Sequence, residues 1–274
     1  MTNPRKHKQG LRCLKSLRDE VDVAACLREI AAGKADIGIC LRELTRHARV
    51  QALMSWFGEG DLASFKHWSY VAGKLRCLMF KHWPYDSFHV CDHLMPLVSD
   101  CSSLVEWLSN LETPYSPDGY YSNPKRTSNP AKPDFTDYNV LLALRGEWAL
   151  LAERSERFLK QEATRRHNYR SDHRFFIGLA SGDRSAMRAA LAELVDPALM
   201  ARRTYDDESS ATRRFICTSA IVYAKIAARH GHTVALDSPW VPPPWMPISP
   251  LAAYADPYPF MRAFQAPLPL RAVS

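Results

Sequence analysis

A cluster of potential metal ligands is the first candidate for chemistry in this chain. His89, Cys91, Asp92 and His93 fall within one short stretch. Imidazole, thiolate and carboxylate groups are ligands of zinc, and histidines at positions i and i+4 lie on one face of a helix. The glutamate of the H-E-x-x-H motif is missing, however, and spacing indicates no further ligand. We therefore expect no bound metal, and a metal-dependent enzyme that uses His89, Asp92 and His93 is kept only as an alternative.

A second candidate is the acidic cluster of Asp206, Asp207 and Glu208. Such a set of carboxylates could hold Mg²⁺. The cluster also stands just before a predicted long helix, where acids pair with unsatisfied N–H groups and with the positive end of the helix dipole. Because no partner cluster accompanies it, the sequence favours a capping role for these residues.

Motifs of nucleophilic or nucleotide-dependent catalysis are absent from the sequence. The chain has no G-x-S-x-G, no P-loop and no G-x-G-x-x-G. Its 7 cysteines are scattered, form no C-x-x-C pair and mostly fall on apolar helical positions. This usage is typical of a reduced, cytoplasmic protein. We expect a protein that is not an enzyme and needs no cofactor.

The net charge of +7 is concentrated at the N-terminus. Residues 1–18 hold six Lys or Arg and no acid, so the remainder has 30 basic against 29 acidic residues. A nucleic-acid-binding face would place its basic residues on the fold itself. We therefore expect a solvated basic arm and no direct contact with nucleic acid. The sequence shows no signal-peptide pattern and no apolar run of membrane-spanning length, so we expect no membrane partner.

Helical periodicity dominates the rest of the chain, and strand patterns are almost absent. The sequence predicts an all-α fold of antiparallel helical hairpins, in a solenoid-like or bundle arrangement, with a proline-rich extended C-terminal segment packed on the helices. The predicted helices cover residues 11–32, 37–57, a third helix from 62, 86–110 (as one helix or as two broken at Pro96), 134–145, 147–160, 172–180, 183–195 and 207–230.

The C-terminal segment is unusual because it is rich in both proline and aromatic residues. Ten of the 19 prolines follow position 236, interspersed with Trp240, Trp245, Tyr254 and Tyr258. Prolines fix an extended backbone, and aromatic side chains favour docking on a helical body over disorder. The predicted organisation is a basic arm at 1–18, a single all-α domain at 19–262 (helical halves 19–111 and 134–236, a proline-rich loop 112–133 and a docked strap 237–262), and a tail at 263–274.

Three glycine–acid pairs mark the predicted turns between helices. They are Gly60-Asp61, Gly146-Glu147 and Gly182-Asp183. Glycine ends a helix in the left-handed conformation without strain, and the acid that follows favours the start of the next helix. Helices joined in this way form antiparallel hairpins.

Several phrases stand out in the C-terminal half of the chain. They are Leu144-Arg145-Gly146-Glu147-Trp148, the stretch from Asp172 through Phe175-Phe176 to Gly182-Asp183, Tyr223-Ala224-Lys225-Ile226-Ala227-Ala228-Arg229-His230-Gly231, Asp237-Ser238-Pro239, and Tyr254-Ala255-Asp256-Pro257-Tyr258. Together these phrases resemble the immunity protein 49 family of bacterial polymorphic toxin systems. The resemblance covers about residues 140–262, whereas the N-terminal half fits only in its helical content and in Gly60-Asp61.

The resemblance implies an all-α cytoplasmic protein that binds a cognate toxin, in a 1:1 complex, and protects the producing cell. Toxins paired with families of this kind are often nucleases. The family carries over no catalytic residues, so Asp206, Asp207 and Glu208 are our candidate toxin contacts only because an acidic patch could meet a basic cleft. A helical-repeat scaffold or adaptor protein is the alternative that the helical hairpins alone favour.

Overall fold

The computed structural model describes residues 4–33, 37–82, 88–110, 124–161, 167–203 and 211–263. Within these ranges the chain is helical and contains no strand, which confirms the predicted all-α class. The chain divides into two compact units. Unit 1 comprises residues 1–87, 95–120 and 249–274, and unit 2 comprises residues 88–94 and 121–248. None of the described helices has the length and apolar character that crossing a bilayer requires.

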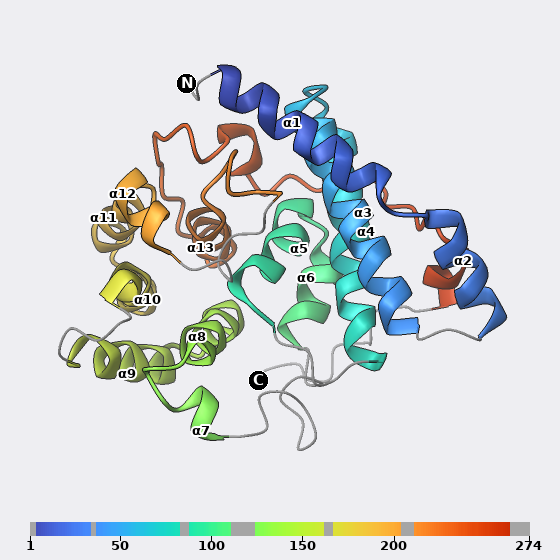
Figure 1. Ribbon diagram of the computed structural model, residues 1–274. Helices are drawn as coiled ribbons and strands as arrows, with labels where there is room; N and C mark the ends of the chain where they lie inside the picture. The colour runs from blue at the N-terminus through green and yellow to red at the C-terminus, as the bar shows by residue number, and fades with distance from the viewer. Residues whose placement is uncertain are drawn as a thin grey trace. The chain divides into compact units, whose positions relative to one another are not determined.

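Unit 1 is built around a long helical hairpin. Helices α3 (Ile37–Phe57) and α4 (Leu62–His82) run side by side over their whole length (Figure 1). The neighbouring helices pack on this pair: α1 and α2 lie against α3, and α6 lies against α4. The remaining bounds are Pro4–Asp19 for α1, Val23–Ala32 for α2, Leu94–Ser99 for α5 and Ser102–Ser109 for α6.

Unit 2 is a succession of shorter helical hairpins. Helix α10 contacts α9 on one side and α11 on the other, and α8 packs on α9. Helix α13 is almost entirely buried and contacts α8, α11 and the 3₁₀ helix η1. The bounds are Val90–His93 for η1, Pro124–Thr127 for α7, Pro133–Arg145 for α8, Trp148–Leu159 for α9, His167–Tyr169 for η4, Arg170–Ser181 for α10, Arg184–Leu194 for α11, Pro197–Arg202 for α12 and Thr218–Arg229 for α13.

The predicted glycine turns are confirmed. Gly146 and Gly182 end α8 and α10 with φ of 74° and 70°, a conformation that other residues adopt only with strain. Asp183 then caps α11, since its carboxylate accepts from the backbone N–H groups of the next helical turn at 2.9 and 3.0 Å. Glu147 is the N-cap residue of α9, but its side chain makes no capping hydrogen bond, so its favourable effect on this helix start is left to the helix dipole.

Two predicted helix boundaries in the N-terminal half are wrong. The single helix expected over 11–32 is two helices, because the Asp22 carboxylate accepts from Ala25 N at 2.8 Å and starts α2 as an N-cap. The break expected at Pro96 lies instead at Asp100 and Cys101, between α5 and α6. Pro96 falls in the first turn of α5, where its missing N–H group is not needed.

The last long helix is shorter than predicted. Of the expected range 207–230, residues 207–210 lie outside the described part, residues 211–215 form turns, and α13 begins only at Thr218. The cause is the proline-rich segment, because the N–H group of Cys217 donates to the carbonyl of Trp240 at 2.9 Å. The residue that precedes α13 therefore has a hydrogen-bond partner that is distant in sequence.

The C-terminal segment is packed on helices in both units, through the 3₁₀ helices η5 (Pro243–Trp245) and η6 (Pro259–Ala263). In unit 2 the Trp245 side chain is fully buried, and Lys225 of α13 donates to the carbonyls of Trp245 and Pro247 at 3.1 and 3.2 Å. In unit 1 the Asp256 carboxylate accepts from Tyr70 Oη at 2.9 Å and from Lys74 Nζ at 2.7 Å. The strap is thus an ordered part of the fold up to residue 263.

Candidate functional site

The residues proposed as metal ligands have structural roles near the start of unit 2. Val90–His93 is a 3₁₀ helix, so the two histidines do not share the face of an α-helix. Asp92 accepts from the backbone N–H group of His89 at 2.9 Å, and the His89 imidazole pairs with Asp137 at 3.1 Å. Among the described residues, no group of three or more His, Cys, Asp or Glu side chains is placed to hold a metal ion.

His93 is fully buried and packs edge-on against Phe88, with 4.4 Å between the ring centroids. Its Nδ1 atom lies 3.2 Å from the carbonyl of His89, whereas its Nε2 atom is buried without a hydrogen-bond partner among the described residues. Burial disfavours the charged imidazolium and lowers the pKa of His93 from 6.5 to about 4. The ring is therefore a neutral core residue near pH 7.

We expect His93 to make stability depend on pH. The unfolded chain binds more protons at this site between pH 6.5 and about 4, so each unit fall in pH through that window costs about 1.4 kcal/mol. The His93→Phe variant lacks this term. Urea unfolding of both proteins at pH 7, 6 and 5 should show the stability of the wild type falling faster than that of the variant. Parallel pH dependences would contradict the prediction, because the other histidines are common to both proteins.

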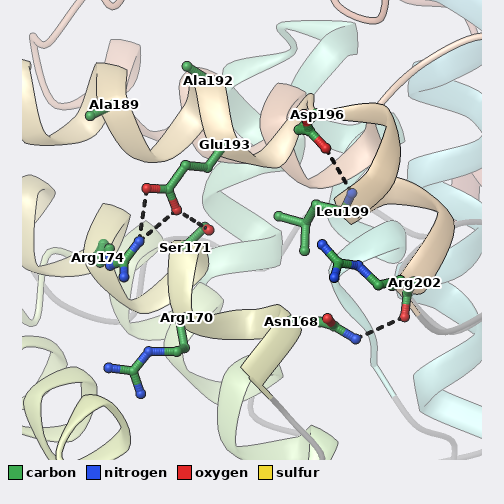
Figure 2. Close-up of a pocket in the computed structure, with 10 residues that line it drawn as sticks. All are labelled: Asn168, Arg170, Ser171, Arg174, Ala189, Ala192, Glu193, Asp196, Leu199 and Arg202. Carbon is green, nitrogen blue, oxygen red and sulfur yellow. Dashed lines mark hydrogen bonds and ion pairs between the residues drawn. The ribbon is translucent and has the colours of Figure 1, made fainter. Parts of the chain in front are cut away.

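The predicted toxin contacts Asp206, Asp207 and Glu208 lie outside the described residues and stay a prediction. The described residues that precede them line an open groove of about 560 Å³ in unit 2 (Figure 2). Three arginines contribute to it: Arg170 and Arg174 from α10, and Arg202 from α12. We call this feature the arginine groove. Its other lining residues are Asn168, Ser171, Ala189, Ala192, Glu193, Asp196 and Leu199.

The acidic side chains of the arginine groove are already engaged. Glu193 accepts from Arg174 through both carboxylate oxygens at 2.8 Å and from the Ser171 hydroxyl at 2.6 Å. The Oδ1 atom of Asp196 caps α12 by accepting from Ala198 N and Leu199 N at 2.8 and 3.1 Å. Both carboxylates of the groove are therefore engaged within the protein, while Asn168 Oδ1 is an acceptor without a hydrogen-bond partner among the described residues.

The arginines, in contrast, keep free donors. Arg202 uses Nε to bind the carbonyl of Ala198 at 3.0 Å, and its terminal amino groups have no partner among the described residues. Arg170 donates through one Nη atom to the carbonyl of Leu159 at 3.1 Å and has no other described partner. Figure 2 shows the Arg202 guanidinium reaching from α12 into the space between Leu199 and α10. The arginine groove thus offers hydrogen-bond donors and positive charge.

A buried ionic network fixes the end of α12, and with it the position of Arg202. Asp172 is fully buried and accepts from both Nη atoms of Arg203 at 2.8 Å. The Tyr223 hydroxyl of α13 also donates to Asp172, at 2.5 Å. Asn168 adds a direct contact, since its Nδ2 donates to the carbonyl of Arg202 at 3.0 Å. The backbone that carries Arg202 is therefore held against α10 on a charged, desolvated anchor.

Sequence reasoning missed the arginine groove. One signal was present, because Arg170 and Arg174 are four residues apart and share a helix face. The contribution of Arg202 has no sequence signature, since it depends on how α12 folds back toward α10.

Comparisons of the chain with models of protein families, with curated proteins and with solved structures find no match.

Proposed function

We propose that this chain is an immunity protein, which binds a cognate bacterial toxin in a 1:1 complex and neutralises it in the cytoplasm of the producing cell. The observation that carries the proposal is the combination of C-terminal phrases that resembles the immunity protein 49 family. A function of this kind requires a stable binding surface and no catalytic group. The free donors of the arginine groove are compatible with such a surface.

The segments that carry the resemblance contact one another in unit 2, which supports interpreting them as one signature. The segments that contain Tyr223 and Asp172 are in contact, because the Tyr223 hydroxyl donates a hydrogen bond to the Asp172 carboxylate. The Tyr223 ring also stacks on Phe175, with 5.1 Å between the ring centroids. His230 packs edge-on against Trp148 at 4.6 Å. Segments that are far apart in the sequence thus form one buried framework in unit 2. A framework of this kind leaves the surface residues free to be specific for one toxin.

The test is co-expression with the protein encoded by the neighbouring gene. If that protein arrests growth, the full chain should restore growth and should co-elute with it as a 1:1 complex in gel filtration. A second toxin with the same effect on growth but an unrelated sequence is the control, and the chain should not protect against it. Continued arrest together with separate elution of the two proteins would reject the proposal.

The helical hairpins of unit 2 also favour a second candidate, a scaffold or adaptor protein. The hairpins α8–α9 and α10–α11 follow one another through glycine turns, as in repeat proteins that present extended binding surfaces. An adaptor should recover several partners in a pull-down from the native host. An immunity protein should recover a single toxin, with slow dissociation.

A further inference from the structure

The donors and acceptors that remain unused in the arginine groove indicate which kind of ligand it could bind. Its two carboxylates serve Arg174, Ser171 and the start of α12, whereas the terminal amino groups of Arg202 and most donors of Arg170 are unused. A guanidinium only donates hydrogen bonds, and its planar fork matches the two oxygens of a carboxylate. The vacant donors therefore fit an acceptor with negative charge.

The surroundings of the arginines favour a peptide over a small inorganic anion. Ala189 and Ala192 of α11 are exposed on one side of the groove, and Leu199 is half-buried beside Arg202. Phosphate or sulfate would gain nothing from these apolar surfaces. A segment of polypeptide can place methyl and methylene groups on them while its carboxylates reach the arginines.

The ion pair inside the groove can exchange partners at little cost. The side chains of Arg174 and Glu193 are 49% and 45% exposed, and ion pairs this exposed to solvent contribute little to stability. A carboxylate from a binding partner could therefore compete with Glu193 for Arg174. The backbone of Arg202, in contrast, is positioned before binding, because Arg202 directly precedes Arg203 and Arg203 is paired with the buried Asp172.

We propose that the arginine groove binds an acidic, partly apolar segment of a partner protein through Arg170, Arg174 and Arg202. The identity of that partner as the toxin rests on the proposed function, whereas the chemistry of the segment rests on the groove alone. The positive charge of the arginine groove is thus opposite in sign to the acidic patch expected from Asp206, Asp207 and Glu208. An acidic loop or helix on the toxin is the element that the groove captures.

A synthetic peptide tests the groove without any knowledge of the partner. The probe is an acetylated peptide that repeats Glu-Leu-Glu-Gly, and the comparison peptide replaces each Glu with Lys. Titration of the acidic peptide into the full chain should shift backbone amide NMR signals of α10–α12, and the Lys peptide and inorganic phosphate should not reproduce these shifts. Absence of shifts at millimolar acidic peptide overturns the inference. Equal shifts with phosphate alone would reduce the groove to a general anion site and overturn it as well.

A matched pair of variants distinguishes binding of the acidic peptide in the arginine groove from general electrostatic attraction to basic residues. The variant Arg174→Ala/Arg202→Ala should bind the acidic peptide about tenfold more weakly or worse, because each lost charge-assisted hydrogen bond is worth about a factor of ten. The control Lys8→Ala/Arg12→Ala removes the same charge from the exposed basic face of α1, where these residues line a separate hollow. It should bind nearly as well as the wild type. Equal weakening in both variants overturns the inference.

The same variants distinguish failure of the inference from failure of the proposed function. If the neighbouring gene product binds the wild type but binds Arg174→Ala/Arg202→Ala equally tightly, the proposed function stands and the groove is not the contact. If it binds neither protein, the proposed function fails, and the peptide titration still decides the chemistry of the groove. Thermal melts of both variants verify folding, which we expect to be retained because Arg174 and Arg202 are exposed.

Discussion

The Asp172→Ala variant is expected to lose about 3–5 kcal/mol of unfolding free energy, because it removes the buried carboxylate that accepts from both Nη atoms of the Arg203 guanidinium. Both partners are desolvated, with exposed side-chain fractions of 0% for Asp172 and 3% for Arg203. The substitution also removes the acceptor of the Tyr223 hydroxyl, which is buried in the same place. Urea unfolding followed by circular dichroism measures the loss.

Three further variants show whether the loss of the buried ion pair is the cause. Tyr223→Phe removes the hydrogen bond that the hydroxyl donates to Asp172 and should cost about 1–2 kcal/mol. Asp183→Ala removes an exposed N-cap and should cost about 0.5–2 kcal/mol. The double variant Asp172→Ala/Arg203→Met removes both charges, so it should be more stable than Asp172→Ala alone. If Asp172→Ala costs no more than Asp183→Ala, the buried pair is not the anchor described above.

The anchor also connects the stability of unit 2 with the arginine groove. Arg202 precedes Arg203 directly, and the Asn168 amide holds the Arg202 carbonyl. A variant that removes the Asp172–Arg203 ion pair therefore loosens a residue whose terminal amino groups are available to a ligand. We expect folded Asp172→Asn, which retains one acceptor oxygen, to bind the acidic peptide more weakly than the wild type.

The local features of the fold were predictable because each depends on a few adjacent residues. Gly182 ends α10 and Asp183 starts α11 through contacts that lie within four residues of the turn. Helix α3 has the predicted bounds and α4 begins at the predicted residue for the same reason: the apolar spacing is regular, and the Asp61 carboxylate accepts from Ser64 N at 3.0 Å.

Features that depend on distant partners were not predictable. The start of α13 is fixed by the carbonyl of Trp240, which lies more than twenty residues later in the chain. Asp172 has the sequence context of an ordinary first-turn acid, and only the fold shows that it binds Arg203 and Tyr223. The groove combines residues of three helices, so its charge could not be read from the local clusters at 89–93 or 206–208.

The strap in unit 2 is the second place where a single change should have a large effect. Trp245→Ala is expected to cost about 3–5 kcal/mol, because the indole is completely buried and its removal leaves a cavity. Ile248→Ala is the matched control in the same segment, since Ile248 is 41% exposed and its loss should cost about 0.5 kcal/mol or less. Similar losses in both variants would mean that the strap lies on the surface without contributing to the core.

Truncation then tests the strap as a whole. A chain that ends at Leu236 loses Trp245 and the two carbonyls that accept from the buried Lys225 ammonium in unit 2. It also loses Asp256, the partner of Lys74 in unit 1. We expect it to melt at a much lower temperature than a chain that ends at Ile248, which keeps the unit 2 contacts and loses only those of unit 1. An unchanged melting temperature after truncation at Leu236 would refute docking, because burial of an aromatic residue and pairing of two lysines cannot both be lost without cost.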